Sequence, residues 1–288
     1  MKMKNIVGID IGGTSIEGGR IEYGRIVSKA KSDTQASIGG ERTMDILKHL
    51  IAGLVTDQTE AIGIGVPSIV DREKGIVYNV QNIAGWDEIP LKAGIEAEFG
   101  LPVHIDNDAN CFAMGEKIFG KGQDCENFVG VTLGTGLGAG IIQGHRLISD
   151  ANCGSGEFGE IPYMDSKLED FCGSRFFLCR GGISGYEAAV KAREGDMRAT
   201  ELFKEYGRHL AYLVKIIMLV LDPQAIIFGG SIAKSFDLFS ASIFSNISDF
   251  PYPKSIENIR ILASDQSDSG ILGAGALCMN TATTRLQL

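Results

Sequence analysis

Apolar residues along this chain follow two spacings, and each spacing predicts one type of element. Continuous apolar runs typical of buried strands occur at residues 6–11, 61–66, 101–105, 225–228 and 259–263. Apolar residues that recur every three or four positions predict helices at residues 37–55, 91–99, 186–194, 199–221 and 270–279. Further expected features are a return strand and a third strand over 16–26, a hairpin over 71–78, and an acid-rich loop over 149–177. This order of elements indicates an α/β fold.

A glycine-rich turn follows the first predicted strand. The strand carries Asp10 near its end, and Gly12, Gly13 and Thr14 come next. Glycines let backbone N–H groups approach a phosphate without a Cβ between them, and Thr14 adds a hydroxyl donor. Asp10 suits such a loop if Mg²⁺ lies between its carboxylate and the phosphate. The same residues also suit a plain β-hairpin with a solvated aspartate.

The pattern occurs a second time further along the chain. VGIDIG from Val7 aligns with VGVTLG from Val129, 122 residues later, and the second copy has Thr132 in place of Asp10. A repeated strand, glycine-rich turn and strand indicates two similar lobes, each with one phosphate-binding loop. Two uncharged loops and one acid for a metal ion suit a nucleoside triphosphate.

Three polar residues follow the predicted strand 101–105, where a helical spacing begins. They are Asp106, Asn107 and Asp108. An N-cap, worth about 1 kcal/mol, accounts for one of the three. A carboxylate at this place can also accept the proton of a substrate hydroxyl, and Asn107 can bind neighbouring hydroxyls. His104 lies inside the strand and is expected to be packed there.

Other candidate contacts carry weaker signals. Pro67 and Ser68 end a buried strand, and ligands of α/β sheets bind at strand carboxyl ends. Trp86, the single tryptophan, is expected to be buried rather than stacked on a sugar, with Asn82 ahead of it as a polar contact. The acid-rich loop is either a solvated surface or a sugar site, because carboxylates accept hydrogen bonds from paired hydroxyls.

The composition of the chain limits the classes of partner that the protein is expected to bind. The chain has 288 residues and a net charge of −9, which argues against nucleic acid as a main partner. Its six cysteines have no CxxC spacing, so buried free thiols are expected and zinc is not. No secretory segment is visible at the start, and the longest apolar run, 210–221, contains a lysine and is shorter than a membrane span. A cytoplasmic protein without a membrane partner is therefore expected.

Taken together in order, these motifs resemble those of the ROK family of sugar kinases. DIGGT, the GVP strand end, IDNDAN, LGTGLGAG, GEIPY, LEDF and IFGG occur in family order over essentially the whole chain. The resemblance implies the actin-like, ribonuclease-H-like ATPase fold, with two lobes and a central cleft. The lobes are expected at 1–107 with 271–288, and at 108–270. A homodimer is expected from the family as well.

The resemblance also implies roles for individual residues. It makes Asp108 the catalytic base and Asp10 the Mg²⁺-associated acid. The residues expected at the nucleotide are Gly12, Gly13, Thr14, Gly134, Thr135, Gly136, Gly229 and Gly230. The residues expected at the sugar are Pro67, Ser68, Asn82, Asn107, Asp108, Glu160, Tyr163 and Glu169.

The chain departs from the family pattern in three places. GEIPY puts Tyr163 where the family has a zinc-ligating histidine in GEIGH, and the cysteine-rich segment CxCGxxGC is missing between Met164 and Leu168. Pro67-Ser68 replaces the usual Pro-Gly. We therefore expect no structural zinc and a sugar pocket altered near the anomeric side. Family repressors carry an N-terminal helix-turn-helix, whereas this chain begins at the first strand, which disfavours that branch.

The resulting expectation is ATP-dependent phosphorylation of a hexose hydroxyl, with glucose O6 as the first choice. Mannose, fructose, allose and N-acetylhexosamines remain alternative substrates. A sugar-binding regulatory protein without turnover is the alternative from another class, and retention of Asp10 and Asp108 weighs against it.

Overall fold

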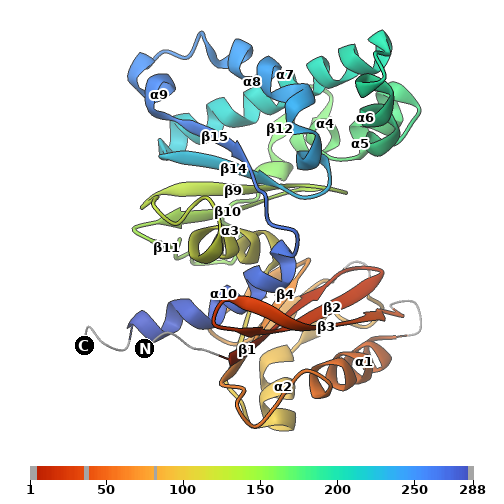
Figure 1. The fold of residues 1–288 in the computed structure, drawn as a ribbon, viewed down its shortest axis with the longest axis vertical. Helices are drawn as coiled ribbons and strands as arrows, with labels where there is room; N and C mark the ends of the chain where they lie inside the picture. Colours follow the sequence, from red (N-terminus) through yellow and green to blue (C-terminus); the bar gives the residue numbers. More distant parts are fainter. Residues whose placement is uncertain (1–4, 36–38, 81–82, 285–288) are drawn as a thin grey trace. The chain divides into compact units, whose positions relative to one another are not determined.

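The computed structural model describes residues 5–35, 39–80 and 83–284, and these fold into two compact units (Figure 1). The first unit comprises the chain to residue 123, residues 146–155 and the chain from 266; the second comprises 124–145 and 156–265. Residues 108–123 and 146–155 thus belong to the first unit, although the lobe expected there from the sequence comprised only 1–107 and 271–288. The reason is that helix α3 (Asp108–Phe119) packs on α10 (Ser269–Thr284), and Arg72 bonds to Ile148 and Asp150.

The first unit is built on a five-stranded sheet of order β3-β2-β1-β4-β8. Strand β1 pairs with β2 as an antiparallel hairpin, whereas β1, β4 and β8 run parallel. The carboxyl ends of these three strands therefore meet at one edge of the sheet. The bounds are β1 Asn5–Ile11, β2 Ser15–Glu22, β3 Arg25–Asp33, β4 Ala61–Val66 and β8 Val103–Asn107.

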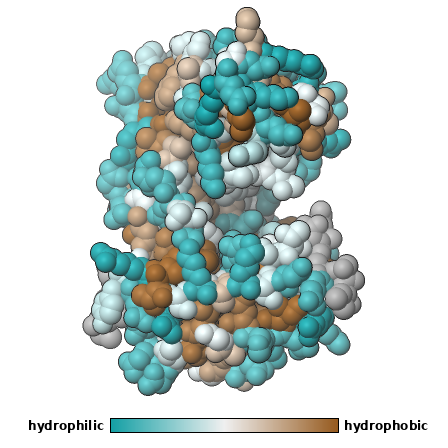
Figure 2. Space-filling model, turned by 45° about the vertical axis from the view of Figure 1, so that its right-hand side comes forward, coloured by the Kyte–Doolittle hydropathy of each residue, from teal (hydrophilic) through white to brown (hydrophobic). Residues whose placement is uncertain are grey.

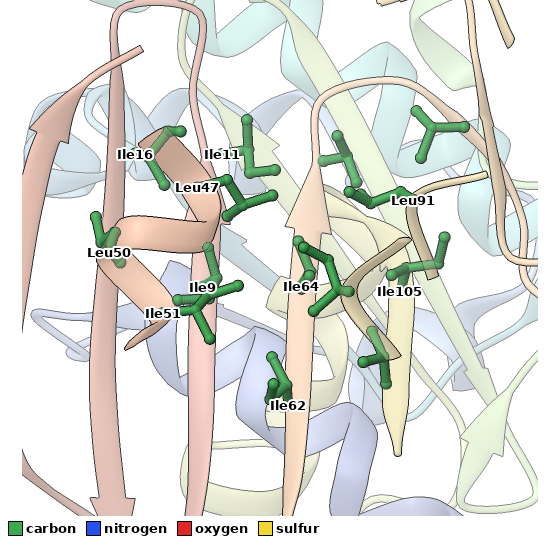
Figure 3. Packing of buried hydrophobic residues seen from close by; sticks show 14 of the residues in the cluster. Ile9, Ile11, Ile16, Leu47, Leu50, Ile51, Ile62, Ile64, Leu91 and Ile105 are labelled. Carbon is green, nitrogen blue, oxygen red and sulfur yellow. The ribbon is translucent and has the colours of Figure 1, made fainter. Parts of the chain in front are cut away.

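Helices cover both faces of this sheet. Leucines and isoleucines of α1 (Gly40–Ala52) and α2 (Leu91–Phe99) form a continuous core with Ile9, Ile64 and Ile105 of the strands (Figure 3). The other face carries α10, which approaches the strands so closely that a Cβ at Gly8 would lie 2.2 Å from the carbonyl oxygen of Ile271. The small residues of 270–279 thus permit close packing, as their composition predicts.

The second unit repeats the same strand plan. Four strands of its sheet have the order β10-β9-β14-β15, which matches β2-β1-β4-β8, and β9 and β10 again form an antiparallel hairpin while β14 and β15 run parallel to β9. The structure thereby confirms the repeat read from Val7 and Val129. The bounds are β9 Phe128–Leu133, β10 Leu137–Gln143, β14 Ala225–Gly229, β15 Arg260–Ala263, α6 Gly185–Arg193, α7 Met197–Leu221, η2 Ile232–Ser235, α8 Phe236–Ile247 and α9 Pro253–Asn258, with β11 Arg146–Leu147 in the first unit.

The acid-rich stretch 149–177 is not the plain loop that its composition predicts. It contains η1 (Phe158–Glu160), a hairpin of β12 (Pro162–Tyr163) and β13 (Ser166–Lys167), and helices α4 (Leu168–Cys172) and α5 (Arg175–Gly181). Apolar side chains between the acids account for the difference. Phe171, Cys172, Phe176 and Phe177 are all buried, and Tyr206 of α7 donates a hydrogen bond to the Cys172 carbonyl.

A small three-stranded sheet, β5-β6-β7, follows β4 (β5 Ile69–Asp71, β6 Ile76–Tyr78, β7 Glu88–Ile89). The first two strands are the hairpin predicted over 71–78, and the third was missed because it spans two residues. Trp86, next to it, is buried, and its indole N–H donates to the Gly40 carbonyl at 3.0 Å, so its predicted packing role is confirmed. The six cysteines are thiols that form no disulfide in the part of the chain that the structure describes; four are buried and Cys179 is exposed.

On the face drawn in Figure 2, hydrophilic residues are interspersed with small hydrophobic patches. None of the helices in the described ranges combines the length and the apolar character that a membrane span requires.

Candidate active site

The sheet of the first unit aligns two acidic residues across three strands. Asp10 of β1 is paired in register with Gly65 of β4, and Gly65 with Asp106 of β8. Gly65 lies between the two acids and has no side chain to separate them. Asp108 comes two residues after Asp106 and begins α3. The carboxyl ends of parallel strands thus gather the acids that the sequence singles out.

Asp10 is held in an environment that disfavours its charge. Burial raises its pKa from 3.8 to about 6, and the neighbouring charges of Asp108 and Glu17 add to the effect. Gly270 in the first turn of α10 makes room for it, since a Cβ there would lie 2.1 Å from Asp10 Oδ2. A partly buried carboxylate beside a second one is a favourable place for a divalent cation, so the residues present fit Mg²⁺.

The three polar residues after β8 have separate tasks. Asp106 is buried and accepts hydrogen bonds from the Asn107 backbone N–H and the Asn110 amide, both at 2.8 Å. Asn107 is the N-cap of α3: its Oδ1 accepts from the Ala109 N–H at 2.8 Å, while its amide donates to the Ser68 carbonyl at 3.1 Å. Only Asp108 is exposed. The base assignment to Asp108 is therefore compatible with the packing, and Asn107 as a sugar ligand stays a prediction.

An arginine that the sequence did not reveal supports this junction. Arg72 lies 3.7 Å from the Asp106 carboxylate and donates to Asp150 Oδ1 at 2.8 Å. Burial raises the pKa of Asp106, and the Arg72 charge opposes that rise. Arg72 is 34 positions from Asp106 and 78 positions from Asp150 along the chain, and no local pattern around Arg72 signals either contact.

The first glycine turn joins β1 to β2. Gly12 N–H donates to the Ser15 carbonyl at 2.8 Å, and Thr34 fixes the turn from outside by donating its hydroxyl to the Gly12 carbonyl at 2.8 Å. Gly13 is half-buried and Thr14 is exposed. The structure thus shows a β-hairpin turn with an exposed Thr14, and phosphate binding by this turn stays a prediction.

The second glycine turn, which lies in the second unit, is contacted by Glu169, one of the residues predicted to bind the sugar. Glu169 Oε2 accepts from the Leu137 N–H at 3.1 Å, and a Cβ on Gly136 would lie 2.3 Å from that oxygen. Ser174 N–H donates to the Gly134 carbonyl at 2.8 Å, which closes the turn from the other side. A side chain at Gly136 would therefore displace the Glu169 carboxylate, and the sequence places the two 33 positions apart without hinting at this contact.

We expect Gly136→Ala to lower the free energy of unfolding by about 1–3 kcal/mol, because the new methyl displaces the Glu169 carboxylate. Gly134→Ala is the matched control: it lies in the same turn, and a Cβ there meets no atom within 4 Å. Its effect should stay within about 0.5 kcal/mol. Urea titrations of both variants measure the difference, and equal effects would contradict the assigned contact.

Glu160 and Glu169 are brought together by a lysine. Lys167 Nζ lies 2.6 Å from Glu160 Oε1 and 3.2 Å from Glu169 Oε1. The sequence marked the two glutamates but not Lys167. Both glutamates remain predicted sugar ligands, and their proximity within the second unit is what such a role requires.

Tyr163, which replaces the family histidine, faces an aromatic cluster. Its hydroxyl hydrogen-bonds His209 Nδ1 at 3.0 Å, and its ring packs at 5.2 Å from Phe171 and 4.6 Å from Tyr212. Burial raises the pKa of Tyr163 and lowers that of His209. The tyrosine thus anchors the β12–β13 hairpin, and its contact with a sugar stays a prediction.

The remaining predicted residues lie at strand ends as well. Ser68, directly after Pro67, donates its hydroxyl to the Tyr78 carbonyl. Gly229 ends β14, and Gly230, with φ 86°, comes so close to β9 that a Cβ would lie 2.4 Å from the Leu133 carbonyl oxygen. Asn82 lies outside the described residues. Within the described ranges no group of three or more histidines, cysteines or acids is arranged to hold a metal ion, and the absence of zinc stays a prediction.

Known proteins of similar sequence cover nearly all of this chain. It matches the ROK family over residues 6–281. The glucokinase of Streptomyces coelicolor is 33% identical over 81% of this chain and 83% of that protein. The glucokinase of Thermotoga maritima is 28% identical over 96% and 98%, and the β-glucoside kinase of Listeria monocytogenes is 30% identical over 93% and 95%.

A solved structure matches the fold. The ROK family glucokinase from Streptomyces griseus in complex with glucose and AMPPNP has a TM-score of 0.79 and 29% sequence identity, covering 95% of this chain and 98% of that chain. The repeated strand plan and these likenesses define an ATP-dependent sugar kinase with the actin-like ATPase fold. The chain belongs to the ROK family.

Proposed function

We propose that this protein transfers the γ-phosphoryl group of ATP to O6 of glucose, with Asp108 as the general base. The observation that carries the proposal is the placement of Asp108 beside Asp10 at the carboxyl ends of β8 and β1, where the charge of Asp108 raises the pKa of Asp10. A base and an acid suited to a metal ion are the two charged groups that phosphoryl transfer to a hydroxyl needs. Similarity to glucokinases supports glucose as the acceptor.

The residues would divide the work as follows. Asp108 accepts the proton of the sugar hydroxyl as that oxygen attacks phosphorus, and its exposed place at the start of α3 leaves its carboxylate accessible. Glu160 and Glu169 accept hydrogen bonds from other hydroxyls, which orients the ring. Backbone N–H groups of the two glycine turns, 12–14 and 134–136, bind phosphate oxygens, with Gly229-Gly230 on the adenosine side. Mg²⁺, when bound with ATP beside Asp10, supplies positive charge that offsets the charge of the phosphates.

Purified full-length protein should release ADP with ATP and Mg²⁺ when glucose is present. The acceptor panel includes mannose, fructose, allose, N-acetylglucosamine, N-acetylmannosamine and a β-glucoside, and the product is assigned by ³¹P–¹H NMR. Glucose is expected to have the highest kcat/KM and to give the 6-phosphate. A higher value for another acceptor would replace glucose, and sugar binding by calorimetry without ADP release would favour a regulatory protein.

A kinase that uses cellular ATP would act in the cytoplasm, and the homodimer is a further proposal that size-exclusion chromatography tests.

A further inference from the structure

A single ammonium group joins the two carboxylates assigned to the sugar. Lys167 Nζ contacts Glu160 Oε1 at 2.6 Å and Glu169 Oε1 at 3.2 Å, and the lysine side chain is 37% exposed. Exposed ion pairs of this kind contribute little to folding stability. The arrangement is therefore better explained by what it does to the carboxylates than by what it adds to the fold.

A third carboxylate belongs to the same cluster. Burial raises the pKa of Glu157, the charges of Glu160 and Glu169 raise it further, and Lys167 lowers it. Three acids thus share one basic partner in this part of the second unit. Without that partner, the carboxylates would repel one another and move apart. Their uncompensated negative charge would also attract cations.

The local fold holds each participant in place. Lys167 lies in β13 and is paired in register with Pro162, while the Leu168 N–H donates to the Ile161 carbonyl at 2.9 Å. The second oxygen of Glu169 accepts a hydrogen bond from the Leu137 N–H, and Oε1 is the oxygen that contacts the lysine. Lys167 therefore connects the β12–β13 hairpin to the turn that follows β9.

We propose that Lys167 is a positioning residue of the sugar site, which holds Glu160 and Glu169 in place and makes the site select neutral sugars over cationic ones. The inference rests on the proposed function, in which these glutamates bind sugar hydroxyls. A carboxylate paired with an ammonium still has lone pairs for a hydroxyl donor. It offers less to an amino sugar, whose own ammonium must compete with that of Lys167.

Kinetics of Lys167→Met test the positioning role. We expect KM for glucose to rise about tenfold while kcat changes less than threefold, and kcat/KM for glucosamine relative to glucose to rise at least fivefold. Lys167→Arg should restore most of the glucose KM, because a guanidinium can bridge two carboxylates as well. Lys204→Met is the matched control, since Lys204 makes a 2.6 Å pair with Glu201 on the exposed side of α7. An unchanged KM, or a sugar preference equal to that of the control, would overturn the proposal.

A measurement without turnover separates this inference from the proposed function. In ¹³C-carboxyl NMR titrations, the pKa of Glu157 should rise in Lys167→Met and stay unchanged in Lys204→Met. An unaltered Glu157 titration would refute the charge-balancing role of Lys167 even if glucose is phosphorylated. Absence of glucose turnover in the unmodified protein, together with a shifted Glu157, would instead refute the proposed function and, with it, the role of Lys167 in the sugar site, and only its charge-balancing effect on Glu157 would stand.

Discussion

Asp108→Asn is expected to lower kcat with glucose by about 10²- to 10⁴-fold, the usual contribution of a general base. Asparagine keeps the size and polarity of the side chain but cannot take up the hydroxyl proton. The change should leave folding intact, because Asp108 is exposed and the N-cap of α3 is Asn107. The KM for glucose should change less than threefold, since the other sugar ligands remain.

The coupled assay of ADP release measures this loss, and calorimetry measures glucose binding. Asp45→Asn, an exposed carboxylate on α1 of the same unit, is the matched control and should keep full activity. A variant that retained kcat within a few-fold would show that the proton leaves by another route. A loss of glucose binding instead of turnover would reassign Asp108 from base to ligand.

Features encoded by local sequence were predicted well. The run 61–66 is β4 with the predicted bounds, and 91–99 is α2, because each pattern is bounded by residues that end it, such as Gly100 in the left-handed conformation. The repeat at Val129 predicted a second hairpin because both copies carry the same alternation and the same glycine turn. Parallel pairing of β1, β4 and β8 then brings Asp10 close to Asp108, a consequence of topology that follows once the fold is known.

Ion pairs made by residues outside the motifs were not predictable in the same way. Arg72 pairs with Asp106 and Asp150, which lie far from it along the chain, and Lys167 pairs with two glutamates close to it in the sequence. Neither cation belongs to a periodic or motif pattern. The helices α4 and α5 were missed because each is only five to seven residues long, so burial against α7 rather than local spacing decides their structure. Tertiary contacts therefore determined what the sequence left open.

Asp10→Asn is expected to make the protein more stable and almost inactive. The pKa of Asp10 is about 6 in the folded protein and near 3.8 in the unfolded chain. The free energy of unfolding therefore falls as pH rises through this window, and above it the ionised carboxylate costs up to about 3 kcal/mol. Asparagine carries no charge at any pH, so the variant should gain up to that amount at pH 7.5 and show almost no gain at pH 4.

Urea unfolding at the two pH values without nucleotide measures the gain, and Glu17→Gln should give a smaller gain of the same sign because Glu17 contributes least to the shift. The same Asp10→Asn variant should lose about 10²- to 10³-fold in kcat, in line with the loss of one electrostatic stabiliser of the transition state. It should also lose the increase in unfolding temperature that ATP with Mg²⁺ gives the unmodified protein. A variant whose free energy of unfolding does not increase at pH 7.5 would show that the ionised Asp10 carboxylate does not destabilise the folded protein. A more stable variant with full kcat would show that catalysis does not need the Asp10 charge. The destabilisation of the fold by ionised Asp10 would then serve another function of the protein.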